Sequence, residues 1–223
     1  MTFSLVATDA SGALGSAVCS SSQAVAARCI HLADHLGAVN SQNITDPRLG
    51  PMLLELLDSG ATAAQALTEL VETTEYMEFR QLLVVDAAGR AAAFSGERSL
   101  GVFGDAIGDG VAAGGNLLAD PDIPQRMIEA FEGATGDLEL RLLAAMRAAQ
   151  AAGGEAGPVH SAGLAVVREA GWRVTDLRVD WTNADPVDEL TAVLTRWLPQ
   201  RDDYVDRGLH PAKAPAYGVP GDD

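Results

Sequence analysis

Residues 2–22, with the sequence TFSLVATDASGALGSAVCSSS, set the pattern that decides the fold. Residues 2–8 alternate as a strand does, residues 9–15 carry the Asp, Ser and Gly of a tight turn, and residues 17–22 resume as a strand. Because short turns of this kind join antiparallel neighbours, the chain is predicted to open with a β-hairpin.

The rest of the chain continues with groups of strands separated by pairs of helices. The expected strands are residues 79–86, 90–95, 161–167 and 174–179, with two more inside residues 24–42. The expected helices are residues 47–58, 63–74, 123–132, 138–152 and 187–198. Hairpin pairing differs from the strict strand–helix alternation of a parallel sheet. The order therefore predicts an α+β fold in which two mainly antiparallel sheets pack face to face, with helices outside.

A glycine-rich stretch, GVFGDAIGDGVAAGGN, occupies residues 101–116. It lacks the Lys-Ser/Thr pair that a phosphate-binding loop requires, and its glycine spacing does not fit a dinucleotide-binding motif. We predict either a mobile loop beside the binding pocket or a turn-rich connector.

The charge balance excludes several classes of partner. The 223 residues include 15 basic and 31 acidic side chains, for a net charge of −16. A surface this acidic repels nucleic acid and anionic membranes, so neither is an expected partner. No apolar run approaches the ~20 residues that span a bilayer.

The domain and compartment predictions rest on composition. Residues 1–199 are expected to form one domain, and residues 200–223, rich in Pro, Gly and charge, a C-terminal tail on or beside it. The N-terminus lacks the basic and apolar regions of a signal peptide. Cys19 and Cys29 are too few for a disulfide framework, so a cytoplasmic protein with reduced thiols is predicted.

Several segments together resemble one bacterial family, domain-of-unknown-function family 1028. They are MTFSLVATD, GPMLLELLDSGATAAQAL, RQLLVVDAAGRAAAFSG, GGNLLADPD, HSAGLAVV, DLRVDWTNADPVDEL and APAYGVPGD. The resemblance covers almost the whole chain and implies membership of the N-terminal-nucleophile (Ntn) hydrolase superfamily. It also implies that superfamily's four-layer αββα sandwich and the hydrolysis of an amide bond, without indicating a substrate.

Within that resemblance, Thr2 is the predicted nucleophile. Initiator Met is normally removed before a small residue, which would leave a hydroxyl and a free α-amine on Thr2. An α-amine has a pKa of ~7.7–8, so it can take the hydroxyl proton while the oxygen attacks a carbonyl. The design needs no lysine, and the chain's single lysine, Lys213, lies in the tail. The alternative is an ordinary strand threonine.

Three further residues are predicted to assist catalysis, each with a structural alternative. Arg80 would lower the pKa of the amine or hold a substrate carboxylate; otherwise it pairs with Glu78 or Asp86 on the surface. The Asn116 amide would donate to a developing oxyanion or contact the substrate; otherwise it caps a turn. Asp9 would orient the amine; otherwise it forms the hairpin turn.

Polar residues at two strand ends are the predicted substrate contacts. They are Ser41, Gln42 and Asn43 at the end of one strand and His160 and Ser161 at the start of another. His31 and His35 are spaced i,i+4 without a third ligand, so no metal is expected, nor any other cofactor.

The sequence thus predicts an Ntn-type amidohydrolase that cleaves an amide or ureido C–N bond of a small metabolite, as a homodimer. The alternative is a catalytically inactive ligand-binding protein on the same scaffold. That alternative rests on departures from the family pattern, including Phe94 where a His is common and His160 where a Gln is common.

Overall fold

The computed structural model describes residues 2–219, which form two antiparallel sheets and six helices. The strands are β1 (Thr2–Thr8), β2 (Leu14–Ser20), β3 (Ile30–Ala33), β4 (Gly37–Asn43), β5 (Arg80–Asp86), β6 (Ala91–Ser95), β7 (Gly104–Gly108), β8 (Val111–Asn116), β9 (Ser161–Val167) and β10 (Arg173–Val179). The helices are α1 (Ala26–Cys29), α2 (Leu49–Asp58), α3 (Ala63–Thr73), α4 (Ile123–Gly133), α5 (Leu138–Ala151) and α6 (Pro186–Leu209), and a 3₁₀ turn spans Met77–Phe79.

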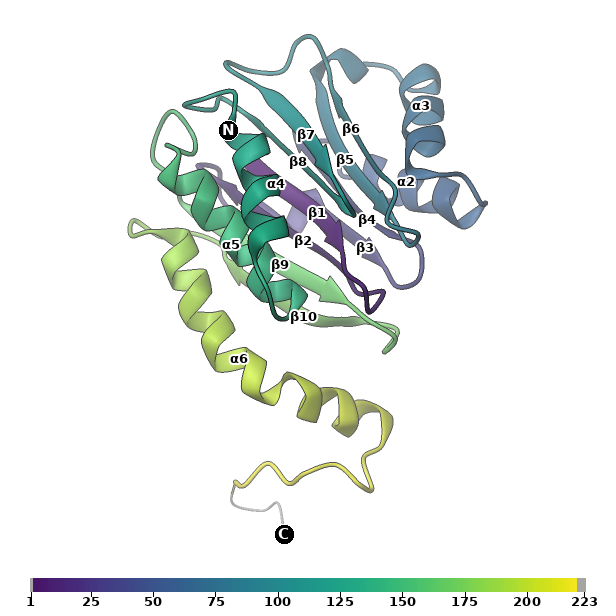
Figure 1. The fold of residues 1–223 in the computed structure, drawn as a ribbon, viewed down its shortest axis with the longest axis vertical. Coiled ribbons are helices and arrows are strands. Elements are labelled where there is room, and N and C mark those ends of the chain that lie inside the picture. Colours follow the sequence, from purple (N-terminus) through teal and green to yellow (C-terminus); the bar gives the residue numbers. More distant parts are fainter. Residues whose placement is uncertain (1, 220–223) are drawn as a thin grey trace.

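The six-stranded sheet has the order β10-β9-β2-β1-β8-β7, and the four-stranded sheet has the order β3-β4-β5-β6 (Figure 1). Each named pair of neighbouring strands runs antiparallel. The predicted mixed α+β fold with two antiparallel sheets is therefore confirmed. β1 lies inside the larger sheet, between β2 and β8, so its residues have a strand on either side.

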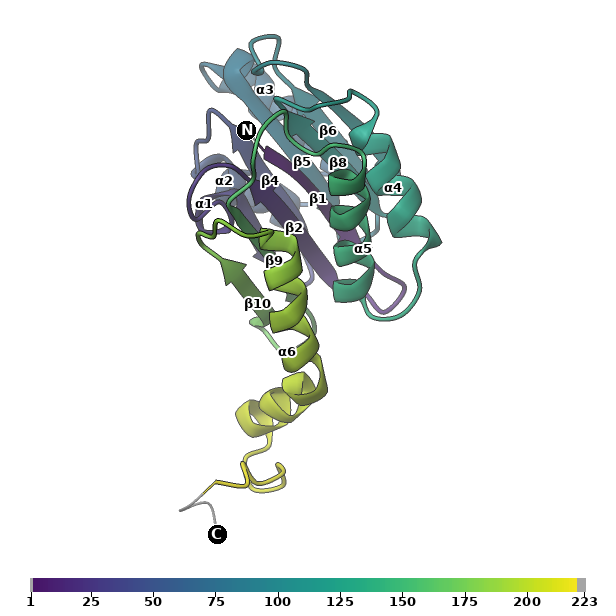
Figure 2. The ribbon, with the colours of Figure 1, turned by 90° about the vertical axis from the view of Figure 1, so that its left-hand side faces the viewer.

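Four apolar clusters of described residues hold these elements together, and the smallest joins α1 and β3 to β2 and β9. The largest joins the six-stranded sheet to α4, α5 and α6, and a second joins the four-stranded sheet to α2 and α3. A third lies between the sheets and includes Val6, Leu83 and Ala112. In Figure 2 the strands lie between α2 on one side and α4 and α5 on the other. Each sheet thus has one face toward helices and one toward the other sheet.

The glycine-rich stretch is ordered structure, so the prediction of a loop or connector was wrong. It forms the β7–β8 hairpin, and β8 pairs with β1 along its length. A Cβ at Gly114 would lie 3.0 Å from Leu83 Cδ2 of the opposite sheet, and one at Gly115 would lie 2.6 Å from Leu118 Cδ2. The glycines allow close packing of the strands. In the sequence, a packed glycine-rich hairpin and a flexible glycine-rich loop look the same.

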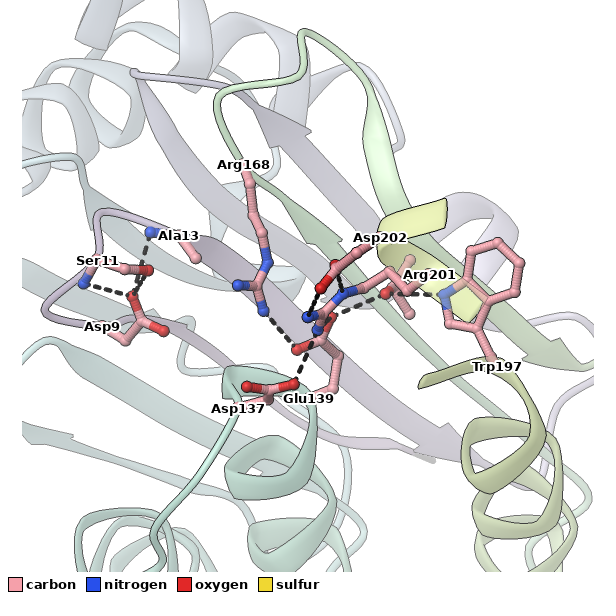
Figure 3. Close-up of polar contacts among 10 residues, drawn as sticks. Asp9, Ser11, Ala13, Asp137, Glu139, Arg168, Trp197, Arg201 and Asp202 are labelled. Carbon is pink, nitrogen blue, oxygen red and sulfur yellow. Dashed lines mark hydrogen bonds and ion pairs between the residues drawn. The ribbon is translucent and has the colours of Figure 1, made fainter. Parts of the chain in front are cut away.

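The last helix is longer than predicted, because α6 continues through Pro199 to Leu209. Beyond the proline, Arg201 reaches the carboxylate of Glu139, which is fully buried at the start of α5. Figure 3 shows Glu139 between Arg201 and Arg168, with N···O distances of 3.0 and 2.8 Å. Thr175 donates to the same carboxylate at 2.9 Å. These contacts stabilise helical residues that composition alone assigned to a tail.

The helix starts follow ordinary capping rules. Thr62 accepts a hydrogen bond from the Gln65 backbone, and the Gln65 side chain accepts one from the Thr62 backbone, forming a capping box before α3. Asp185 accepts from the backbone N–H groups of Val187 and Asp188 at the start of α6. Across residues 2–219, none of the helices is both long enough and apolar enough to cross a bilayer.

Candidate active site at the N-terminal end of β1

Thr2 lies on the face of β1 that is turned toward the other sheet. Phe3 and Leu5 belong to the cluster with α4 and α5, whereas Val6 belongs to the cluster between the sheets. Since side chains alternate along a strand, Thr2 and Ser4 share the face of Val6. Only 5% of Thr2 is exposed. The predicted nucleophile is therefore placed at the end of the space between the sheets.

Hydroxyl and amide groups flank Thr2 in a row across the six-stranded sheet. Thr2 pairs in register with Asn116 on β8, and its Oγ1 donates to Ser20 Oγ on β2 at 3.3 Å. Ser20 in turn pairs with Ser161, the first residue of β9. The order Ser161, Ser20, Thr2, Asn116 thus runs across four adjacent strands. Sequence positions far apart meet here because they all lie at strand ends.

A chain of hydrogen bonds connects Thr2 to an arginine that the sequence did not single out. Ser20 Oγ lies 2.8 Å from Ser22 Oγ, and Arg28 Nη2 donates to Ser22 Oγ at 2.8 Å. Arg28 Nη1 also donates to the carbonyls of Gln23 and Ala24. A positive charge is thereby fixed two hydroxyl groups away from the Thr2 oxygen.

The amide groups of this region form a second chain, which links the two sheets. Ser4 donates to Gln42 Oε1 at 2.6 Å, and Gln42 Nε2 donates to Gln81 Oε1 at 2.8 Å. Asn116 Nδ2 donates to the same Gln81 oxygen at 3.1 Å. Gln81 Nε2 donates to the carbonyl of Gly115 at 3.0 Å. Each amide therefore has its orientation fixed by its neighbour.

The hydrogen-bonded row of amides determines which atoms of Asn116 have partners. One N–H of its NH₂ group donates to Gln81, while its fully buried Oδ1 has no hydrogen-bond partner among the described residues. The atom open to a ligand is thus an acceptor, which suits an N–H or ammonium group. The predicted contact with an oxyanion would use the second N–H of the same amide, and it stays a prediction.

Glu155 is a buried carboxylate near the ends of β8 and β2 that sequence reasoning missed. Its backbone bridges to Leu118, just after β8, and its carboxylate oxygens accept from the N–H of Ser21, just after β2, at 3.0 and 3.2 Å. β1 lies between β8 and β2 in the sheet, so the two anchor points of Glu155 flank the strand that begins with Thr2. Burial raises the pKa of Glu155 to about 7.

The predicted substrate residues His160 and Ser161 lie beside this row. The His160 backbone donates to the carbonyl of Ser20, its Nδ1 lies 2.8 Å from the Thr182 carbonyl oxygen, and its ring stacks on Trp181 with centroids 4.3 Å apart. Ser161 donates to the Ser22 carbonyl oxygen at 2.6 Å and accepts from the Val25 N–H at 3.3 Å. Both residues support the loop that carries Ser22.

Asp9 does not reach the site. It lies in the turn after β1, and seven strand residues separate the two ends by roughly 20 Å. Figure 3 shows its Oδ1 accepting from the Ser11 backbone and side chain and from the Ala13 backbone. Asp9 is therefore the turn-forming residue that the sequence allowed as an alternative.

Arg80, Ser41 and Asn43 lie at the same end of the molecule but off the site. Arg80 shares a face of β5 with Leu82, which packs against α2 and α3, and it donates to the Ile44 carbonyl. Ser41 donates to the Asp46 carbonyl, and Asn43 bonds the backbones of Phe79 and Leu100. All three hold loops, whereas Gln42 is part of the amide chain.

Phe94 also lies away from the row, packed against the cluster of α2 and α3. Its departure from the family pattern therefore does not alter the site. The expected removal of Met1 concerns a residue outside the described range. Among residues 2–219 there is no group of three or more His, Cys, Asp or Glu side chains arranged to hold a metal ion.

The site residues that were not predicted from the sequence differ in how much local signal they gave. Gln81 follows Arg80 in a strand, and since neighbours in a strand face opposite ways, a polar Gln on the face of Leu83 and Val85 was a detectable signal. Three successive serines, 20–22, marked the end of β2. Arg28 and Glu155 carried no local signal, because only tertiary folding brings them to β1.

A two-sheet α+β fold with a buried polar row at the end of an interior strand defines the class of this molecule. The chain belongs to the family of unknown function DUF1028, whose sequence model matches residues 2–190. The search of curated proteins gave no match.

The solved structures that resemble it include the following two. The crystal structure of protein SPO2555 from Silicibacter pomeroyi, of the same family, is 28% identical, with a TM-score of 0.82 over 87% of this chain and 88% of that one. Anbu (ancestral beta-subunit) from Yersinia bercovieri is 9% identical, with a TM-score of 0.40 over 97% of this chain and 100% of that one. The family resemblance inferred from the sequence is confirmed.

Proposed function

We propose that this protein is an Ntn hydrolase that cleaves an amide or ureido C–N bond of a small metabolite, with Thr2 as nucleophile. The observation that carries the proposal is the position of Thr2, whose hydroxyl lies between Ser20 and Asn116 at the end of the space between the sheets. Two antiparallel sheets with helices on their outer faces are consistent with the four-layer αββα arrangement of that superfamily.

The reaction needs only groups at this site. After removal of Met1, the α-amine of Thr2 accepts the proton of Oγ1 as that oxygen bonds to the substrate carbonyl carbon. The C–N bond then breaks, and the leaving nitrogen takes the proton from the new ammonium. Water, deprotonated by the amine, hydrolyses the resulting ester and restores the Thr2 hydroxyl.

Neighbouring residues have defined roles in this scheme. Ser20, held by Ser22 and Arg28, fixes the Thr2 hydroxyl on the inner face of the sheet. Asn116 Oδ1 accepts an N–H of the substrate, which primary amides and ureido groups both supply. This acceptor supports the proposed substrate class.

The proposal includes a cytoplasmic homodimer. Cys19 and Cys29 are buried and form no disulfide within the described chain, which suits a reducing compartment. Sedimentation velocity of the purified protein tests the dimer, and a single monomeric species contradicts it.

Intact mass and turnover test the proposal together. We expect the mass of a chain lacking Met1, and ammonia release from at least one compound in a panel of primary amides and ureido compounds. Thr2→Ala should reduce turnover by at least about 10³-fold, because loss of a nucleophile removes the covalent route, whereas Thr2→Ser should retain part of it. Wild-type turnover in Thr2→Ala would show that Thr2 is not the nucleophile.

A second candidate function is ligand binding without turnover. It is favoured by the closure of the site, since Gln42, Gln81 and Asn116 are fully buried. Ligands that raise the melting temperature of wild type and of Thr2→Ala equally, with no product formed, would support it. An acyl group found on Thr2 by peptide mass spectrometry would exclude it.

A further inference from the structure

We propose that Glu155 is the positioning residue that holds the α-amine of Thr2 as an ammonium group at the end of β1. The inference rests on the proposed function, in which Thr2 is the first residue of the mature chain. It gives Glu155 the task that sequence reasoning gave to Asp9.

The sheet order places Glu155 in line with β1. Its backbone is anchored at Leu118, beyond the end of β8, and its carboxylate is anchored at the N–H of Ser21, beyond the end of β2. β1 lies between these two strands and points its N-terminal end at the same edge. A carboxylate that crosses from one neighbour to the other must pass the backbone nitrogen end of Thr2.

The Glu155 carboxylate is suited to a cation. It is only 4% exposed, and the donor it has among residues 2–219 is the neutral N–H of Ser21. A buried carboxylate is stable when a cation pairs with it, and a carboxylate has about four acceptor positions. An ammonium from Thr2 would supply the missing charge without moving the bond to Ser21.

Other titratable groups around Glu155 leave this role to it. The charge of His160 favours the charged form of Glu155. The pKa of the Cys19 thiol, on β2, is raised by burial and by the charges of Glu155 and Asp185. A neutral thiol cannot hold an ammonium. Burial also keeps the pKa of Glu155 near that of an α-amine, so the two groups exchange protons over the same pH range.

The consequence for catalysis is a stabilised ammonium. When the Thr2 amine takes the proton from Oγ1, a positive charge appears on nitrogen, and the Glu155 carboxylate lies where it lowers the energy of that charge. The aspartate of a Ser-His-Asp triad supports its histidine in the same way. Glu155 acts through the amine and does not itself contact the reacting carbonyl.

The single lysine allows a direct test. A mature chain that begins at Thr2 has two primary amines, the Thr2 α-amine and Lys213. Both are converted to ¹³C-dimethylamines, and their methyl signals are followed by NMR as a function of pH in wild type, Glu155→Gln and Glu129→Gln. Glu129, exposed on α4, is the matched control.

We expect Glu155→Gln to lower the pKa of the Thr2 amine by about one unit, a tenfold weaker hold on its proton. Lys213 and the Glu129→Gln variant should titrate as in wild type. The alkaline rise of kcat/KM should move to lower pH by the same amount. Equal Thr2 titration in wild type and folded Glu155→Gln overturns the inference.

The two proposals fail separately. If the isolated protein retains Met1, the nucleophile proposal is wrong, and the titration is then run after treatment with methionine aminopeptidase. If Glu155→Gln does not fold, wild type alone decides. A Thr2 pKa above the ordinary ~7.7–8 supports the contact with Glu155, and a pKa within or below that range excludes it.

Discussion

Two glutamates of this protein are buried to nearly the same degree, yet their surroundings differ. Glu139 accepts hydrogen bonds from Arg168, Arg201 and Thr175, so its negative charge is fully paired. Glu155 accepts from one backbone N–H, and burial raises its pKa to about 7. The first carboxylate fastens α6 to the body of the molecule, and the second has capacity left for a ligand or a terminal amine.

The comparison shows how to separate structural from functional polar groups in a buried setting. A satisfied group stabilises the fold and has nothing left to offer. An incompletely satisfied group costs stability and persists where it serves another purpose. Asn116 Oδ1, which has no hydrogen-bond partner among the described residues, belongs with Glu155 in this respect, and Asn116 pairs in register with Thr2.

The largest expected effect is on the paired glutamate. Glu139→Gln leaves Arg201 and Arg168 without their shared counter-charge, and breaking a buried ion pair in this way costs about 3–5 kcal/mol. Urea unfolding measures the loss. Asp188→Asn, which removes the exposed partner of Arg147, is the control and should cost at most about 1 kcal/mol. Equal losses in the two variants would mean that the Glu139 cluster contributes no more than a surface pair.

The stability of the folded chain should depend on pH through Glu155. The pKa of Glu155 is raised from 4.5 to about 7 in the folded chain, so the folded state binds its proton more tightly than the unfolded state. Stability relative to Glu155→Gln should therefore fall as pH rises from about 4.5 to about 7, by up to about 3 kcal/mol. Unfolding curves at several pH values measure it. A difference that does not change with pH would mean that the Glu155 carboxyl titrates normally.

A smaller effect is expected where the site meets the close packing of the sheets. In Gly115→Ala the new Cβ would lie 2.6 Å from Leu118 Cδ2 and 3.1 Å from the Thr2 carbonyl oxygen. Overpacking of this kind costs about 1–3 kcal/mol and should shift Thr2. Gly133→Ala is the control, because a Cβ there meets nothing within 4 Å. Equal melting temperatures in the two variants would contradict the role given to Gly115.

Much of the fold was predictable because hairpins leave local signals. Alternation marked the strands, and Thr62 with Gln65 marked the start of α3. The β7–β8 hairpin was missed because Gly114 and Gly115 serve tertiary packing against Leu83 and Leu118, which no local pattern records. The second half of α6 was missed because an ion pair to a distant helix stabilises it.

Only the site residues that lie in strands were predictable from the sequence. Thr2, Gln42 and Asn116 come together because strand ends meet at one edge of the molecule. Asp9 was excluded by geometry that the sequence already contained, since a seven-residue strand separates its two ends. Arg28 and Glu155 required the order of strands in the sheet, which is a tertiary property.

The hydrogen bonds between the amides of the two sheets each have a fixed donor and acceptor, and this order extends to Asn116 in the site. Ser4 donates a hydrogen bond to Gln42, Gln42 donates to Gln81, and Asn116 donates to Gln81 as well. The Asn116 oxygen is left without a hydrogen-bond partner among the described residues. Turning over one glutamine would bring two oxygens or two NH₂ groups face to face, so the orientations change together or not at all. Whether the site presents an acceptor or a donor is thus decided in the opposite sheet, where a mutation could invert ligand preference without altering a residue of β1.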